Sequence, residues 1–175
     1  DRKVPLLPVF VWFYILAFPF WAVGYLLAAR RGKDMFYRFV ATDLTIHFIC
    51  FICFILIPTT NIRPEIPGNT LSEKILALVY SLDGGNSPSN LFPSIHCYVS
   101  WMCWKGVEGS EKVPKWYQRF SLVFAILIII STQVLKQHYI VDAAAALLLV
   151  EFFWRFYQKG QRHKWVVHVF AHKKK

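Results

Sequence analysis

Long apolar stretches alternate with short polar segments along almost the whole chain. Five apolar runs stand out, at residues 4–29, 39–57, 92–105, 120–135 and 139–157. About 20 apolar residues are enough for a helix to cross a bilayer. We therefore expect five membrane-spanning helices. The third is short by this measure, and Pro19 is expected to kink the first, because proline interrupts helix hydrogen bonding.

A shorter segment between the second and third runs has a different pattern. Its apolar residues recur at helical spacing, at Leu71, Ile75, Leu78 and Leu82. Thr70, followed three residues later by Glu73, forms a capping box, which marks a helix start. We expect residues 71–82 to form an amphipathic helix that lies in the membrane interface. Residues 81–90, rich in Gly, Asn, Ser and Pro, are expected to form a loop.

The composition fits this pattern. The chain has 175 residues, is 56% hydrophobic and 18% aromatic, and has a mean hydropathy of +0.39. These values predict one integral membrane domain over residues 1–175, an all-α polytopic helix bundle with five spans and one interfacial helix. The chain starts at Asp1 rather than Met, so a sixth span before it is left open.

The distribution of charge orients the predicted bundle. The net charge is +10, but the basic residues lie between apolar blocks, which favours the bilayer surface over nucleic acid as their partner. Loops after the first, third and fifth runs, together with the C-terminal segment, hold fifteen of the twenty Lys and Arg residues. By the positive-inside rule these loops are cytoplasmic. We expect a protein of the plasma membrane whose other loops face the extracytoplasmic side.

Two polar clusters interrupt the apolar pattern, and both fall on the expected extracytoplasmic face. The first is Pro93-Ser94-Ile95-His96, and the second runs from Ser131 to His138 and Asp142. A neutral imidazole can attack phosphorus and form a phosphohistidine without a metal. The spacing of His138 and Asp142 suits a carboxylate that orients the attacking ring, and His96 is the candidate acid for the departing oxygen. Backbone N–H groups after Pro93, around Ser94 to His96, are expected to hold phosphoryl oxygens.

Together the two clusters resemble the second and third signatures of the type 2 phosphatidic acid phosphatase superfamily. That family comprises membrane lipid phosphatases, lipid phosphotransferases and soluble vanadium haloperoxidases. The resemblance implies that His138 is the nucleophile, His96 the acid and Asp142 the residue that orients His138. The expected substrate-binding residues are Arg63, Ser94, Ser131 and Lys136.

The chain departs from the family pattern at two cations. The first family signature has a Lys seven residues before Arg-Pro, and Arg63-Pro64 is present here, but Leu56 stands at the Lys position. Thr132 stands where the third signature has Arg. Lys136, one helical turn beyond Thr132 and on the same predicted face, is the candidate replacement. These departures look more like the branch that contains inositol phosphorylceramide synthase and sphingomyelin synthase.

Three functions remain open at this point. The first is a metal-independent phosphatase that hydrolyses a phosphate monoester or pyrophosphate of a membrane lipid. The second is a phosphotransferase that moves a headgroup between lipids, and the third is a non-catalytic lipid binder or transporter. No metal or cofactor is expected, because no carboxylate cluster lies near either signature, and His47, Cys50 and Cys53 are interpreted as structural. The expected partners are the lipid substrate and the bilayer, and the oligomeric state is left open.

Overall fold

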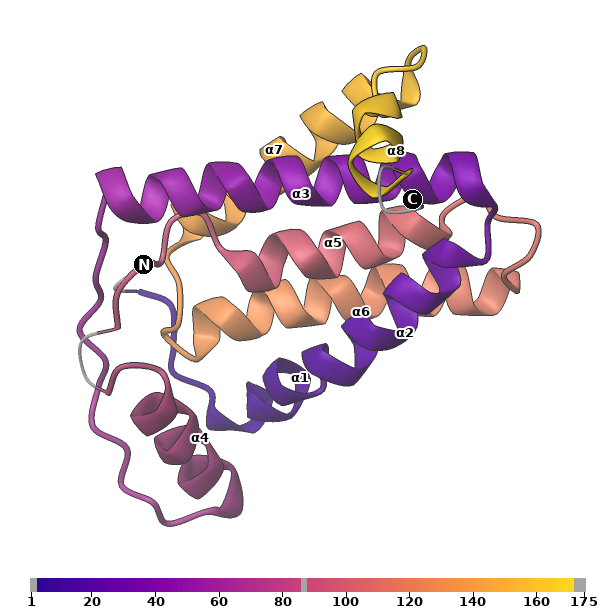
Figure 1. The fold of residues 1–175 in the computed structure, drawn as a ribbon. Coiled ribbons are helices and arrows are strands. Elements are labelled where there is room, and N and C mark those ends of the chain that lie inside the picture. The colour runs from indigo at the N-terminus through magenta and orange to yellow at the C-terminus, as the bar shows by residue number, and fades with distance from the viewer. Residues whose placement is uncertain (1–2, 86–87, 172–175) are drawn as a thin grey trace.

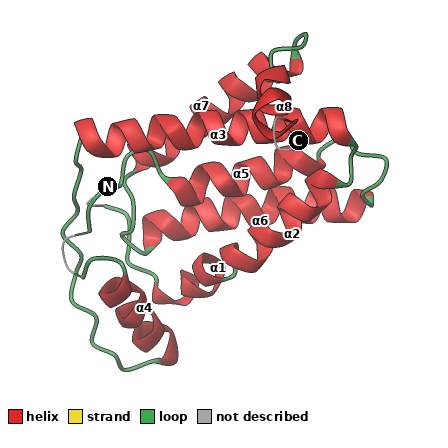
Figure 2. Cartoon of the chain, viewed as in Figure 1, coloured by secondary structure: helices red, strands yellow, loops and turns green. Residues whose placement is uncertain are grey.

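The regular structure of the chain is helical (Figure 2). The computed structural model describes residues 3–85 and 88–171. Its elements are η1 (Pro8–Phe10), α1 (Val11–Ile15), α2 (Ala17–Ala29), α3 (Lys33–Leu56), α4 (Leu71–Leu82), α5 (Ile95–Val107), α6 (Lys115–Val134), α7 (Ile140–Gln158) and α8 (Lys164–Ala171). Across these described ranges no strand forms, apart from an isolated bridge between Thr60 and Ser89. The predicted all-α fold is confirmed.

Three helical segments are long and apolar enough to cross a membrane. They are Pro8–Ala29, Lys33–Leu56 and Lys115–Val134. α5 has 13 residues, and α7 carries three charged residues along its 19 residues, so length and composition do not mark these two as spans. The three long helices indicate a membrane protein, and the count of five spans stays a prediction.

The first span is interrupted one turn before Pro19. α1 ends at Ile15 and α2 begins at Ala17, with Leu16 between them. Pro19 has no N–H to donate to the carbonyl oxygen of Ile15, four residues earlier. Helical hydrogen bonds resume on either side, from Leu16 N to Trp12 O (3.0 Å) and from Phe20 N to Leu16 O (3.2 Å). The helix is therefore interrupted where a kink is expected, and the cause of the interruption is local.

α3 and α6 begin earlier than the apolar runs that predict them. α3 starts at Lys33 rather than at residue 39, and α6 starts at Lys115 rather than at residue 120. The extra turns carry charged side chains, and Arg38 donates to Asp34 one turn earlier at 2.8 Å. Long charged side chains reach water from a helix end, so a helix can continue beyond its apolar run.

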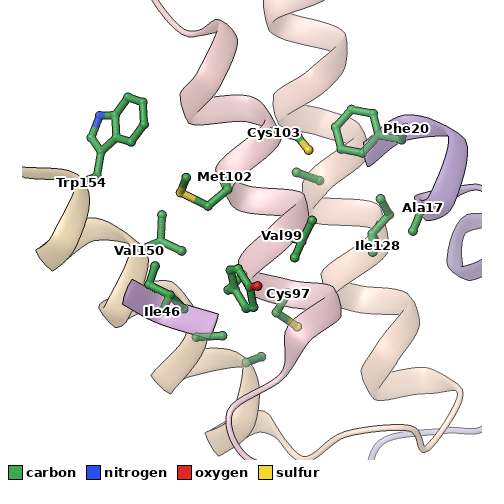
Figure 3. Packing of buried hydrophobic residues seen from close by; sticks show 14 of the residues in the cluster. Ala17, Phe20, Ile46, Cys97, Val99, Met102, Cys103, Ile128, Val150 and Trp154 are labelled. Carbon is green, nitrogen blue, oxygen red and sulfur yellow. The ribbon is translucent and has the colours of Figure 1, made fainter. Parts of the chain in front are cut away.

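α5 lies at the centre of the bundle, where it packs against α2, α3, α6 and α7 (Figure 1). Met102 of α5 points towards Val150 and Trp154 of α7, and Cys103 points towards Phe20 of α2 (Figure 3). The packing against α2 is close at Gly24, where a Cβ atom would lie 2.6 Å from Cys103 Sγ. Neighbouring helices therefore surround α5, which has 13 residues, and separate much of it from lipid.

α4 lies apart from the bundle axis, at the end that holds the chain's N-terminal segment (Figure 1). The predicted capping box is confirmed, because Thr70 Oγ1 accepts from Glu73 N (3.3 Å) and Glu73 Oε2 accepts from Thr70 N (3.0 Å). Leu76 and Tyr80 are buried against η1 and α1. Of the predicted apolar stripe, Leu71, Leu78 and Leu82 are exposed, whereas Ile75 packs against the buried residues. An exposed apolar stripe beside the spans suits a helix in the membrane interface.

The connections between the helices fall into two groups, one at each end of the bundle. Figure 1 shows the turns α2–α3, α5–α6 and α7–α8 at one end, and the connections α3–α4, α4–α5 and α6–α7 at the other. The first set contains the basic loops of the sequence, and the second contains both polar clusters. The two clusters therefore meet at the end opposite the basic loops.

Candidate active site

The turn between α6 and α7 places His138. α6 ends at Val134, and Lys136 adopts a positive φ of 53°. The carbonyl oxygen of Thr132 then accepts the backbone N–H groups of Gln137 (2.9 Å) and His138 (3.1 Å). Lys136 therefore lies beyond the helix and does not share a helical face with Thr132. That expectation was wrong, because a non-glycine residue in the left-handed region ends the helix without a signal in the apolar pattern.

Asp142 lies against the ring of His138. Asp142 Oδ2 is 3.5 Å from His138 Nδ1, and the Asp142 side chain is 2% exposed. The same oxygen accepts the backbone N–H of Tyr139 at 2.8 Å, which fixes the carboxylate at the start of α7. A carboxylate facing Nδ1 favours the tautomer that carries its proton there. Nε2 of His138 is then the unprotonated nitrogen.

Ser94 joins the two polar clusters at the start of α5. Its hydroxyl oxygen accepts the N–H of Cys97 (3.3 Å), and its own N–H donates to the carbonyl oxygen of Asp142 (3.3 Å). The N–H groups of Ile95 and His96 lie in the first helical turn, where no intrahelical acceptor exists. Of the backbone donors expected to hold a phosphoryl group, the Ser94 N–H is thus occupied by Asp142.

The ring of His96 lies among aromatic side chains. It stacks on Tyr14 with ring centroids 4.3 Å apart, and it contacts Trp21 (5.1 Å) and Phe18 (5.9 Å). Its centroid is 6.3 Å from that of His138. The two rings are too far apart for a direct hydrogen bond and close enough to flank one phosphoryl group.

A polar pocket of about 520 Å³ opens on one side of His138. Its polar lining comes from Asn61, Arg63, Gln133, Lys136, His138 and Tyr139. Asn61 holds two of its walls together, because it donates to the carbonyl oxygen of Lys136 (2.7 Å) and accepts from the Tyr139 hydroxyl (3.0 Å).

A second pocket, aromatic and of about 330 Å³, also borders His138. Four aromatic side chains line it together with both histidines: Tyr14, Phe18, Trp21, Phe54, His96 and His138. Loop residues before α5, including Asp83, Ser89 and Asn90, complete its wall. His138 lines both pockets, whereas His96 lines only the aromatic pocket.

Arg63 reaches the polar pocket, but most of its donors are used. Nη1 donates to the carbonyl oxygens of Tyr80 (3.3 Å), Asp83 (2.8 Å) and Gly85 (3.0 Å). Nη2 donates to the Asp83 carboxylate (2.5 Å) and to Gln137 Oε1. Burial raises the pKa of Tyr80 to about 12, although the Arg63 guanidinium over its ring opposes the rise. Arg63 therefore binds the carbonyl oxygens at the C-terminal end of α4 and also lines the polar pocket.

Two further expected substrate-binding residues have local partners. The Ser131 hydroxyl is buried and donates to the carbonyl oxygen of Ile128 (2.6 Å), one turn earlier in α6. Lys136 Nζ donates to the carbonyl oxygen of Val4 at the rim of the polar pocket. Contact of Arg63, Ser94, Ser131 or Lys136 with a phosphate stays a prediction.

Buried polar atoms without a hydrogen bond gather at this place. In the described part of the chain seven such side-chain atoms occur, and five belong to the site: Arg63 Nε, His96 Nε2, Gln133 Oε1, Gln137 Nε2 and His138 Nδ1. The last of these lies 3.5 Å from the Asp142 carboxylate without a hydrogen bond to it, so the atoms without a polar partner are the other four. Buried polar groups are normally paired, and an unpaired one costs about 1–3 kcal/mol. A concentration of them is typical of a place that binds a polar ligand.

No metal site competes with this interpretation within the described residues, where no group of three His, Cys, Asp or Glu side chains is arranged to hold an ion. His47 is hydrogen-bonded to the Tyr98 hydroxyl, and Cys50 and Cys53 are free thiols. Independence from metal remains a prediction.

Several residues of the site were not found from the sequence. Tyr14, Phe18 and Trp21 surround His96 although they precede it by about 75–82 residues, and aromatic residues are common throughout the predicted spans. Asn61 precedes Arg63 by two residues, and Tyr139 directly follows His138. The hydrogen bond that joins them connects residues 78 positions apart and could not be predicted from the sequence.

A family model described as the PAP2 superfamily matches residues 2–155. The match covers both polar clusters and all helices from η1 to most of α7. Comparisons with curated proteins and with solved structures gave no match.

Proposed function

The chain belongs to the PAP2 superfamily, and we propose that it transfers a phosphoryl group from a membrane lipid through a covalent intermediate on His138. Membership of the superfamily supports an activity of the phosphatase or phosphotransferase type on lipid phosphates. The observation that carries the proposal is the placement of His138, which is backed by Asp142 and lies 6.3 Å from His96 between ring centroids.

In the first step Nε2 of His138 forms a bond to phosphorus, and the bond from phosphorus to the lipid oxygen breaks. His96 gives its proton to that oxygen, which leaves as an alcohol. The negative phosphoryl group between the rings stabilises the protonated form of His96 before the transfer. Asp142 stabilises the positive charge that develops on His138.

In the second step an acceptor attacks phosphorus and the phosphorus–nitrogen bond breaks. His96 takes the proton of the acceptor, and His138 returns to its neutral form. With water as acceptor the enzyme is a phosphatase for a lipid phosphate monoester or pyrophosphate, which is the function we favour. The chemistry assigns no step to a metal ion.

A second candidate is transfer of a headgroup to a lipid alcohol. Two observations favour it. Leu56 and Thr132 stand where the family pattern has cations, and the charge of Arg63 is balanced by Asp83 2.5 Å away. A site with little net positive charge is better suited to a monoanionic phosphodiester than to a dianionic monoester. The polar pocket of about 520 Å³ also offers room for a headgroup that stays attached to phosphorus.

The location we propose is the plasma membrane, with the site on the extracytoplasmic side. The support for this orientation is that the start of α5, which carries His96, and the α6–α7 turn, which carries His138, lie at the end opposite the basic loops (Figure 1).

One experiment separates the candidate functions. Purified protein in vesicles is incubated with a labelled lipid phosphate monoester or phosphodiester, with and without a lipid alcohol, beside the His138→Ala variant. Free phosphate identifies a phosphatase, and a new phospholipid identifies a transferase. Absence of both products with every donor, in a folded protein, would contradict the proposal and leave a lipid binder or transporter.

A further inference from the structure

The aromatic pocket has no role in the chemistry described so far. It is the pocket that His96 lines, and its walls come from α1, α2, α3 and the loop before α5. Four aromatic side chains line it beside the polar residues Asp83, Ser89 and Asn90, and three of the four rings contact His96. A ligand next to the departing oxygen would therefore meet a largely apolar surface.

The stereochemistry of the reaction determines where that ligand lies. In an in-line displacement the leaving oxygen departs from the side of phosphorus opposite the attacking atom. His138 is the attacking group in the first step and the leaving group in the second. The leaving alcohol and the later acceptor must therefore occupy, in turn, one position on the side of phosphorus away from His138.

His96 identifies this position. The group that protonates the leaving oxygen also deprotonates the acceptor, so both oxygens lie within hydrogen-bond reach of the His96 ring. His138 borders both pockets, but His96 borders the aromatic pocket alone. The leaving alcohol and the acceptor are consequently on the aromatic side, and the polar pocket receives the substituents that stay on phosphorus.

We propose that the aromatic pocket is the subsite for the lipid alcohol of the reaction, and that Phe18 and Trp21 determine which alcohol it accepts. This inference rests on the proposed function. The ligand class is an alcohol with a long apolar chain, bound first as the leaving part of the donor. In a transferase the same subsite then binds the acceptor, whereas in a phosphatase water replaces the departed chain.

The position of Phe18 suits entry from the bilayer. Phe18 lies in the first span and is 56% exposed, although its ring contacts both Trp21 (5.1 Å) and His96 (5.9 Å). Phe54 borders the pocket from the end of α3, another span. A chain from the adjacent leaflet can reach His96 between these two rings.

Removal of one ring tests the subsite. Phe18→Ala takes away apolar contact next to His96, and its exposure makes a folding defect small. Phe48→Ala is the matched control, because Phe48 is 63% exposed on α3 and borders neither pocket. The readout is the ratio of kcat/KM for a long-chain lipid phosphate to kcat/KM for a short-chain, water-soluble phosphate with the same headgroup.

We expect Phe18→Ala to lower this ratio about tenfold, the effect of losing part of a buried phenyl contact. Phe48→Ala should leave it within twofold of the parent. Trp21→Phe, which keeps a ring beside His96, should lower it less than Phe18→Ala. In a parent that transfers to lipid alcohols, Phe18→Ala should also raise the share of hydrolysis.

The result that overturns the inference is an active Phe18→Ala protein whose ratio equals that of Phe48→Ala. A parent without turnover on either donor, with its melting temperature intact, contradicts the proposed function instead. The two failures are therefore distinguishable in one set of measurements.

Discussion

The backbone N–H of Ser94 donates to the carbonyl oxygen of Asp142 at 3.3 Å. This hydrogen bond joins the starts of α5 and α7, which are far apart in the sequence. His96 follows Ser94 by two residues, and His138 lies 3.5 Å from the Asp142 carboxylate. One backbone contact thus holds the proposed acid and the proposed nucleophile in a fixed relation.

Replacement of Asp142 by Asn tests the orientation of His138. An amide oxygen can still accept the Tyr139 N–H, so α7 should keep its start, but it cannot stabilise a positively charged ring. We expect kcat to fall by up to about 10⁴-fold, the loss seen when a buried Asp that holds a catalytic His is replaced by Asn. The matched control is Glu111→Gln, an exposed carboxyl-to-amide change at the opposite end. A folded Asp142→Asn protein with the kcat of the parent would remove Asp142 from the mechanism.

Replacement of Lys136 by Met distinguishes a phosphate contact from a structural one. A hydrogen bond to a charged group contributes about 1.5–3 kcal/mol, so loss of a phosphate contact should reduce turnover of a monoester about tenfold to a hundredfold. If the contact of Lys136 with Val4 is purely structural, the Lys136→Met variant should have a lower melting temperature and the same kcat as the parent. Lys74→Met removes an exposed charge from α4 at the same end of the bundle and controls for the general loss of positive potential.

Local features of the fold could be predicted from the sequence. The capping box at Thr70 and Glu73 depends on residues three positions apart, and the interruption before Pro19 depends on one missing N–H. The starts of α3 and α6 were placed too late, because the apolar pattern does not register charged turns that extend a helix into water. The positive φ of Lys136 had no signal, since glycine is the usual residue in that conformation.

Of the candidate site, only the residues that belong to sequence motifs could be predicted. His96, His138 and Asp142 were identified by spacing and resemblance, and the fold brings them together. The contacts of Arg63 with Asp83 and Gln137 could not be predicted, because they depend on how the end of α4 and the α6–α7 turn approach Arg63 in the fold. The same applies to the aromatic pocket, whose walls come from segments far apart in the sequence.

Chelation tests the proposed independence from metal. Because both steps use only imidazole, carboxylate and backbone donors, excess chelator should change the rate by less than twofold. Vanadate, which can adopt the five-coordinate geometry of the transition state, should inhibit, and an equal concentration of sulfate should not. Strict dependence of the rate on added Mg²⁺ would favour a metal-assisted mechanism.

Cysteine labelling tests the orientation in the membrane. Ser81 on α4 and Glu111 in the α5–α6 loop are exposed at opposite ends of the bundle. In intact cells an impermeant thiol reagent should label Ser81→Cys, and it should label Glu111→Cys only after the membrane is opened. The parent, whose four cysteines lie within α3 and α5, provides the background. Labelling of both variants in intact cells would contradict the proposed topology.

We propose above all that His138 carries the phosphoryl group. The most direct measurement is mass spectrometry of enzyme mixed with a lipid phosphate for less than one turnover and quenched in alkali, where phosphohistidine survives. We expect a phosphoryl adduct on His138 in the parent, which keeps its headgroup ester if the enzyme transfers headgroups, and no adduct in folded His138→Ala protein. Turnover without an adduct at His138, or undiminished turnover by the His138→Ala variant, would contradict it.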